Sequence, residues 1–177
     1  MHRKIYGFSE KEGTFSPLFL YKKMDKERVI TLMNEAIADN ESLFLIEYSI
    51  SNTGDILIIV DGDSGVSLDE CIRISRHIEH NLDREIFDFS LQVTSPDIAK
   101  PLVHLRQYHK NIGRVLKIRT ATEKYQGKLL GVEDNKLLLT WKTREPKPIG
   151  KGKHTVIKQV KIDIVDIVET KVKIVYN

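Results

Sequence analysis

The sequence predicts an α+β protein built from two modules, an acidic one of helices and strands followed by a basic one of strands. Apolar residues recur at helical spacing twice in the first half, around segments that alternate as strands do. After Tyr108 the helical spacing ends, and short apolar stretches separated by turn residues follow one another. The charge also changes sign. Residues 24–100 carry 6 Lys or Arg against 16 Asp or Glu, a balance of −10, whereas residues 101–177 carry 17 against 7, a balance of +10.

The composition is that of a folded protein. With 177 residues, of which 41% are hydrophobic and 30% charged, the chain suits one medium domain or two small ones and is unlike a disordered chain. Its single cysteine, Cys71, excludes an intramolecular disulfide and fits a reducing environment. No apolar run approaches the roughly 18 residues that a membrane-spanning helix needs. We therefore expect a cytoplasmic protein that does not span a membrane.

A poorly ordered extension is predicted over residues 1–23, because this stretch shows no sustained helical or strand period. The acidic module is expected over residues 24–95. Two amphipathic helices are predicted in it, the first over residues 25–39 and the second opening at Ser67, whose side chain can cap the helix.

Three strands accompany these helices. They are expected over residues 43–51, 56–60 and 87–93. In the first strand, simple alternation would place one set of side chains on a common face: Phe44, Ile46, Tyr48 and Ile50. The order helix–strand–strand–helix–strand predicts a small sandwich with both helices on one face of the sheet.

A stiff connector is predicted over residues 96–102, because Pro96 and Pro101 fix their own backbone and extend the residue before each of them. The basic module, over residues 103–177, is expected to form five short strands that close into a small β-barrel. These strands are expected near Val115 and Ile118 and over residues 125–132, 135–141, 155–162 and 170–176. Residues 142–153, between the third and fourth strands, are predicted to be a basic loop rich in Gly and Pro.

The cations of the basic module are candidates for nucleic-acid binding, because Lys and Arg that neutralise phosphates give affinity without regard to base sequence. The residues singled out are Lys142, Arg144, Lys147, Lys151 and Lys153 in the loop, with Arg114 and Lys117 before it. Tyr108, Tyr125 and Trp141 could stack on bases, although Trp141 fits a core position equally well. A run of charge can also be no more than a solvated loop.

The opposite charges of the two halves have two interpretations. In the first, the basic half binds nucleic acid and the acidic half binds a basic partner, with Asp61, Asp63 and Asp69 as the acidic surface. In the second, the two halves attract each other. The sequence leaves both open.

No pattern for catalysis or for a cofactor stands out. Asp61, Asp63 and Gly65 resemble the start of a calcium loop, but Val66 and Ile72 stand where such a loop needs Gly and Glu. The histidines have neither a cysteine pair nor an H-E-x-x-H pattern with which to bind zinc. Glycine motifs for nucleotides and the G-x-S-x-G nucleophile motif are also missing. We expect no catalytic site, no metal and no cofactor, and therefore no enzyme.

A series of linked motifs runs from the first module through the connector. In order they are Val60-Asp61-Gly62-Asp63-Ser64-Gly65-Val66-Ser67-Leu68-Asp69-Glu70-Cys71, Ile74-Ser75-Arg76, Leu82-Asp83, Leu91-Gln92-Val93-Thr94-Ser95-Pro96 and Lys100-Pro101-Leu102. The second module adds Ile162-Asp163-Ile164-Val165-Asp166-Ile167. From about Met24 to the C-terminus, the chain resembles the ribosome maturation factor RimP family.

This resemblance implies an N-terminal α+β domain and a C-terminal Sm-like, SH3-type barrel. It also implies a non-enzymatic cytoplasmic factor that binds the free small (30S) ribosomal subunit and assists its late assembly. The expected partners are 16S rRNA and a basic small-subunit ribosomal protein, and the expected state is a monomer. The alternative is a general Sm-like RNA-binding module or a protein-interaction adaptor without ribosome specificity.

The connector departs from the family pattern. The family has S-P-G and R-P-L, whereas this chain has Asp97 after the first proline and Lys100 before the second. Aspartate lacks the conformational freedom of glycine, and lysine lacks the forked donor of arginine. The connector residues that the resemblance marks as docking candidates are Ser95, Pro96, Lys100 and Pro101.

Overall fold

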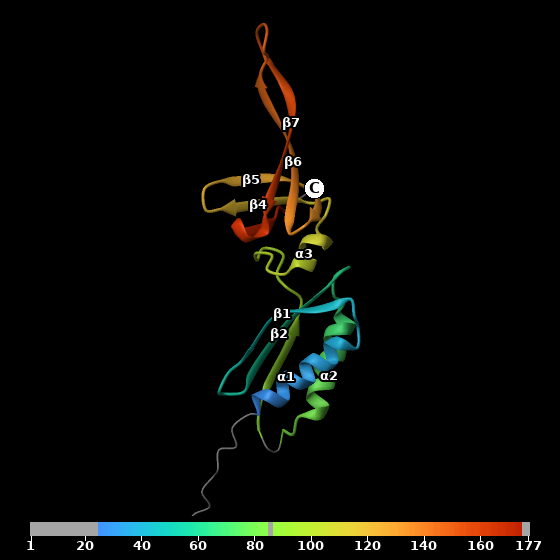
Figure 1. Cartoon of the computed structure of the whole chain (residues 1–177). Coiled ribbons are helices and arrows are strands. Elements are labelled where there is room, and N and C mark those ends of the chain that lie inside the picture. The colour runs from blue at the N-terminus through green and yellow to red at the C-terminus, as the bar shows by residue number, and fades with distance from the viewer. Residues whose placement is uncertain (1–24, 85–86, 175–177) are drawn as a thin grey trace, which may run out of the picture.

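The computed structural model describes residues 25–84 and 87–174, which form three α-helices, eight β-strands and one 3-10 helix (Figure 1). The strands make two sheets, one of three strands and one of five. The mixed α+β class predicted from the sequence is thus confirmed. The predicted extension over residues 1–23 lies outside the described residues.

The first sheet and its helices follow the predicted order. The elements are α1 (Lys26–Ala38), β1 (Leu43–Ile50), β2 (Asp55–Gly62), α2 (Leu68–Asn81) and β3 (Ser90–Thr94). The sheet order is β1-β2-β3; β1 pairs antiparallel with β2, and β2 pairs parallel with β3. A parallel pair needs a crossover, which α2 provides. Both helices begin at a side-chain cap, since Asp25 accepts from the Arg28 N–H at 3.0 Å and Ser67 from the Glu70 N–H at 3.2 Å.

The apolar faces of these elements meet in one core. Its fully buried members include Leu32 and Met33 of α1, Ile58 of β2, and Ile74 and Ile78 of α2. The continuous apolar run of β2 is explained by its position, because the central strand of this sheet has little contact with solvent.

The simple alternation predicted for β1 is wrong, because a bulge shifts the register between Leu45 and Glu47. An extra residue in one strand turns the following side chains to the other face. Tyr48 therefore lies opposite Ile58, on the other face of the sheet from Phe44, and its side chain stays 43% exposed. Phe44, on the other face, is 6% exposed and lies against His104 and Arg106 of the following module.

Gly54 in the β1–β2 turn supplies a first prediction. Its φ is +99°, and an added Cβ would lie 2.6 Å from the Asp88 carbonyl oxygen. We expect Gly54→Ala to lower the free energy of unfolding by more than about 1 kcal/mol, because both the backbone conformation and the space exclude a side chain. Urea unfolding would measure the loss. Gly150→Ala is the control, because the φ of Gly150 is +88° but no atom lies within 4 Å of an added Cβ. A similar loss in both variants would mean that the backbone conformation alone causes it.

A short helix that the sequence analysis missed lies between the two sheets, α3 (Leu105–Lys110) (Figure 1). Its first turn is fixed by two side chains, because His104 Nδ1 accepts from the Arg106 N–H at 3.2 Å and Gln107 Oε1 accepts from the His104 N–H at 3.1 Å. Tyr108 of this helix is 4% exposed and belongs to the second core.

The second module contains the five predicted strands: β4 (Val115–Thr120), β5 (Lys124–Glu133), β6 (Lys136–Pro146), β7 (Lys153–Asp163) and β8 (Ile167–Val172). Neighbouring strands pair antiparallel in the order β7-β6-β5-β4-β8. The 3-10 helix η1 (Ile164–Asp166) joins β7 to β8. These two strands lie at opposite ends of the hydrogen-bonded ladder, so the predicted closure into a barrel is not confirmed. The predicted end of the last strand, at Tyr176, lies outside the described residues.

Half of the predicted loop over residues 142–153 is strand. Lys142 to Pro146 continue β6 and pair with β7, from Lys142 opposite Ile157 to Pro146 opposite Lys153. The turn is left with residues 147–152. The basic residues led to the prediction of a loop, although the β-branched residues Thr143, Thr155 and Val156 favour strands. The result is a long β6–β7 hairpin that projects from the rest of the molecule (Figure 1).

Candidate nucleic-acid interface

Five of the predicted cations lie on the projecting hairpin, and we call them the hairpin cations. Lys142 and Arg144 lie on β6, Lys147 and Lys151 in the turn, and Lys153 at the start of β7. All five are exposed, and none has an ion-pair partner among the residues that the structure describes. The arrangement presents unneutralised positive charge to solvent at the end of a narrow protrusion.

Arg114 and Lys117 are not part of this group. Arg114 lies between α3 and β4 and lines a cavity beside the connector, whereas Lys117 lies on β4 with its side chain exposed. The predicted cations therefore occupy three separate places in the second module.

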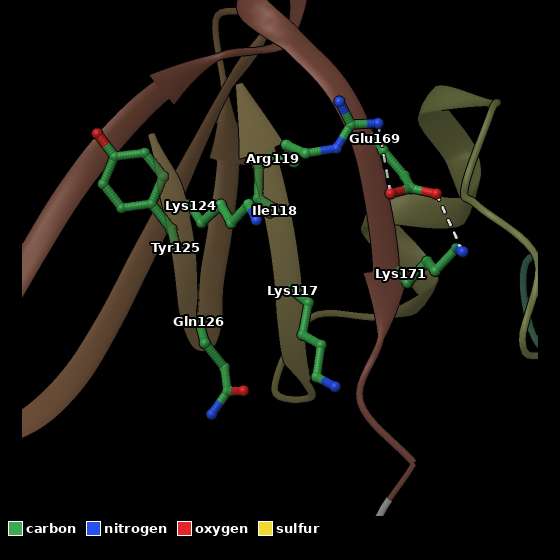
Figure 2. A pocket seen from close by; sticks show the side chains of 8 residues that line it. All are labelled: Lys117, Ile118, Arg119, Lys124, Tyr125, Gln126, Glu169 and Lys171. Atoms are coloured by element: carbon green, nitrogen blue, oxygen red, sulfur yellow. Dashed lines mark ion pairs between the residues drawn. The ribbon is translucent and has the colours of Figure 1, made fainter. Parts of the chain in front are cut away.

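Lys117 also belongs to a second group of cations, whose other members the sequence analysis did not single out. A depression of about 450 Å³ lies over β4, β5 and β8 (Figure 2). Lys117, Arg119, Lys124 and Lys171 line it, and we call these four residues the cationic sheet face. The alternation in β4 was a usable signal, because Leu116 and Ile118 are buried and the alternate residues Lys117 and Arg119 lie on the other face.

The three aromatic candidates are all tied to the core of this module. Tyr108 is buried, so its ring is not available for stacking on a base. Tyr125 and Trp141 pack against the same core, with ring centroids 6.3 Å apart, and remain partly exposed. The Tyr125 hydroxyl donates to the Glu123 carboxylate, which raises the pKa of Tyr125.

Asp61, predicted as part of an acidic surface, is 2% exposed and faces α3. Lys110 Nζ lies 2.5 Å from its Oδ1, and Gln107 Nε2 donates to its Oδ2 at 3.2 Å. The Gly62 N–H also donates to Oδ1, at 2.8 Å. This carboxylate is therefore used within the chain, to hold the second module against the end of β2.

Asp63 is also bound by α3. Arg106 donates to the two carboxylate oxygens of Asp63 at 2.8 and 2.5 Å, and to the carbonyls of Leu43 and Glu41 at 3.1 and 2.7 Å. The hydrogen bond from Arg106 is the main cause that lowers the pKa of Asp63. We call these contacts of Arg106, Gln107 and Lys110 the joint. These contacts support the second interpretation of the charge asymmetry, in which the two halves of the chain attract each other.

Asp69 differs from the other two aspartates. It lies exposed in the first turn of α2, where a negative charge suits the helix dipole. Among the three predicted acidic residues, it is the one outside the joint.

The connector runs beside the joint. Asp97 stabilises it from within, because Asp97 Oδ1 accepts from the Ala99 N–H at 2.8 Å and the Asp97 carbonyl accepts from the Lys100 N–H at 3.0 Å. Its φ is not positive, so the departure from glycine at this position causes no backbone strain. Pro96, Lys100 and Pro101 line a cavity of about 200 Å³ together with joint residues, and Ser95 lies just before it, after β3.

Residues 25–84 and 87–174, which the structure describes, contain neither a candidate metal centre nor a candidate membrane-spanning helix. No three His, Cys, Asp or Glu residues there are grouped so that they could hold a metal ion. No helix there has the length and apolar character needed to cross a membrane.

Comparisons with known proteins place the chain among similar sequences. The family model described as the RimP N-terminal domain matches residues 32–99. A Christiangramia forsetii protein named ribosome maturation factor RimP is 52% identical over 153 residues, covering 86% of this chain and 100% of its own length. Proteins of the same name from Flavobacterium psychrophilum and Porphyromonas gingivalis W83 are 48% and 33% identical, covering 85% and 81% of this chain and 98% and 95% of their own lengths.

Proposed function

This chain belongs to the ribosome maturation factor RimP family, and we propose that it assists late assembly of the small (30S) ribosomal subunit by binding the free subunit. In this proposal the second module contacts 16S rRNA, and the acidic first module receives a basic small-subunit ribosomal protein. Differential affinity for one arrangement of the immature rRNA would hold that arrangement while other parts assemble. The protein acts as a cytoplasmic monomer without catalysis or a cofactor.

The observation that carries this proposal is the excess of unneutralised cations on the second module. Of its 17 Lys and Arg residues, seven have an ion-pair partner among the described residues. The other ten are Arg114, Lys117, Lys124, Lys128, Lys142, Arg144, Lys147, Lys151, Lys153 and Lys173. Cations without an internal partner are available to neutralise phosphates, with release of the counterions around the RNA.

We also propose that the second module is an Sm-like, SH3-type barrel and that the domains run over residues 24–95 and 103–177. The antiparallel order β7-β6-β5-β4-β8 and the 3-10 turn before the last strand support this architecture. Two separate buried clusters, one for each sheet, support the division into domains. For the acidic surface, the joint uses Asp61 and Asp63, which leaves Asp69 as the member free to meet a basic partner.

Co-sedimentation tests the proposed function. We expect the purified protein to sediment with free small subunits in preference to large subunits and assembled ribosomes, and to be released as salt is raised. The alternative, a general RNA-binding or adaptor module, predicts equal capture by all three particles or by an equal mass of unrelated structured RNA. Either of those results would contradict a function specific to the small subunit.

A further inference from the structure

The cationic sheet face has an arrangement that costs stability in the free protein. Lys117 of β4 lies directly opposite Lys171 of β8, and Arg119 of β4 lies directly opposite Lys124 of β5. Like charges at directly opposed positions of an antiparallel pair destabilise the sheet. Two such pairs side by side therefore indicate a surface whose charge is needed for something other than folding.

One carboxylate partly relieves this repulsion. Glu169 of β8 lies opposite Arg119 and is 3.6 Å from its guanidinium and 3.0 Å from Lys171 Nζ (Figure 2). The hydrogen bond from Lys171 is the main cause that lowers the pKa of Glu169. Lys117 and Lys124 have no acidic partner among the described residues, so the face keeps an excess of positive charge.

The spacing of the cations suits a repeating anion better than a single carboxylate. Along β4, alternate residues are about 7 Å apart, and opposed residues on neighbouring strands are about 5 Å apart. The face is thus a grid of positive charges over the depression, with neutral Gln126 and Tyr125 at its side. A phosphate backbone presents charges at comparable intervals, and its affinity comes from counterion release rather than from a shaped pocket.

We propose that the cationic sheet face binds the phosphate backbone of RNA and that Glu169 is the internal counter-ion that this backbone displaces. The inference rests on the proposed function, because it names the part of the ribosomal partner that this surface contacts. Glu169 holds Arg119 and Lys171 in the free protein and repels phosphate, so it limits the affinity of the face. The β6–β7 hairpin is a separate contact, formed by other strands.

The experiment compares three variants by the salt dependence of binding to a fluorescently labelled RNA hairpin and to free small subunits. For Lys117→Gln/Lys171→Gln, we expect weaker binding. The slope of log affinity against log salt should decrease in magnitude by about 1.4–1.8, because two phosphate contacts are lost. For Glu169→Gln, we expect tighter binding and a steeper plot. Damage to the fold is expected to weaken binding, so a gain in the Glu169→Gln variant, with its thermal stability unchanged, separates the proposed effect from misfolding.

Lys136→Gln/Lys161→Gln is the matched control. It removes the same charge from cations that are paired with Asp163 and Glu133 away from the depression. An equal loss of slope in the control would mean that the effect comes from net charge alone, and it would overturn the proposal. An unchanged slope in the Lys117→Gln/Lys171→Gln variant would also overturn it. So would the absence of tighter binding in the Glu169→Gln variant. If the wild-type protein binds the RNA hairpin but not small subunits, the proposed function fails. The variants would still show whether the cationic sheet face binds RNA. If it binds neither, both fail.

Discussion

An Asp61→Ala variant is expected to lose about 3 kcal/mol of the free energy of unfolding. Removing one partner of a buried ion pair leaves the other charge without compensation, which typically costs about 3–5 kcal/mol. The lower end applies here, because the Lys110 side chain keeps 25% of its exposure and can be partly rehydrated, whereas the Asp61 side chain keeps 3%. Gln107 Nε2 and the Gly62 N–H would lose an acceptor as well.

Urea denaturation at neutral pH measures this loss. The control is Asp166→Ala, which removes an exposed aspartate that has no ion pair among the described residues and should change stability by no more than about 0.5 kcal/mol. A double-mutant cycle with Lys110→Met separates the pair from its surroundings, and we expect a coupling energy above about 1 kcal/mol. A loss no larger than that of the control would show that the joint does not stabilise the fold.

The joint also shows what the sequence could and could not predict. The helices and strands of the first module were predictable because each is long enough for its apolar period to appear, as in β2 and α2. Helix α3 has six residues, fewer than two turns, so no period can develop. Its role depends on contacts between residues more than 40 positions apart, such as Arg106 with Asp63, and charge alone could not say whether these aspartates meet a partner or their own chain.

The sequence predicted a cationic interface on the second module, but it predicted less well which residues lie together in it. The cations of residues 142–153 were predicted from the charge of this stretch. Its Gly and Pro content indicated a loop, so the outer part of β6 was not predicted as strand. On the sheet face, only Lys117 was selected, because the pairing that brings it beside Lys171 joins strands separated by most of the module. Strand register is set by the tertiary arrangement, and a bulge such as the one in β1 alters it without any clear sign in the sequence.

Neutralising the turn of the projecting hairpin should have the largest effect on binding. Lys147, Lys151 and Lys153 are exposed cations at or beside the turn, without ion pairs in the described chain. For Lys147→Gln/Lys151→Gln/Lys153→Gln, we expect weaker binding to free small subunits. The slope of log affinity against log salt should fall by roughly 2–3 if each lysine contacts one phosphate. Thermal stability should be nearly unchanged, because exposed turn residues away from the core contribute little to it.

The charge-retaining variant Lys147→Arg/Lys151→Arg/Lys153→Arg separates charge from shape, since arginine keeps the positive charge but changes the geometry of the donors. We expect it to keep the wild-type salt slope. An unchanged slope in the glutamine variant would refute the role of the turn. Because the hairpin and the cationic sheet face lie on different strands, their losses of slope should add when the glutamine variants are combined. A combined loss no greater than either alone would mean that the two surfaces do not contact the RNA at the same time.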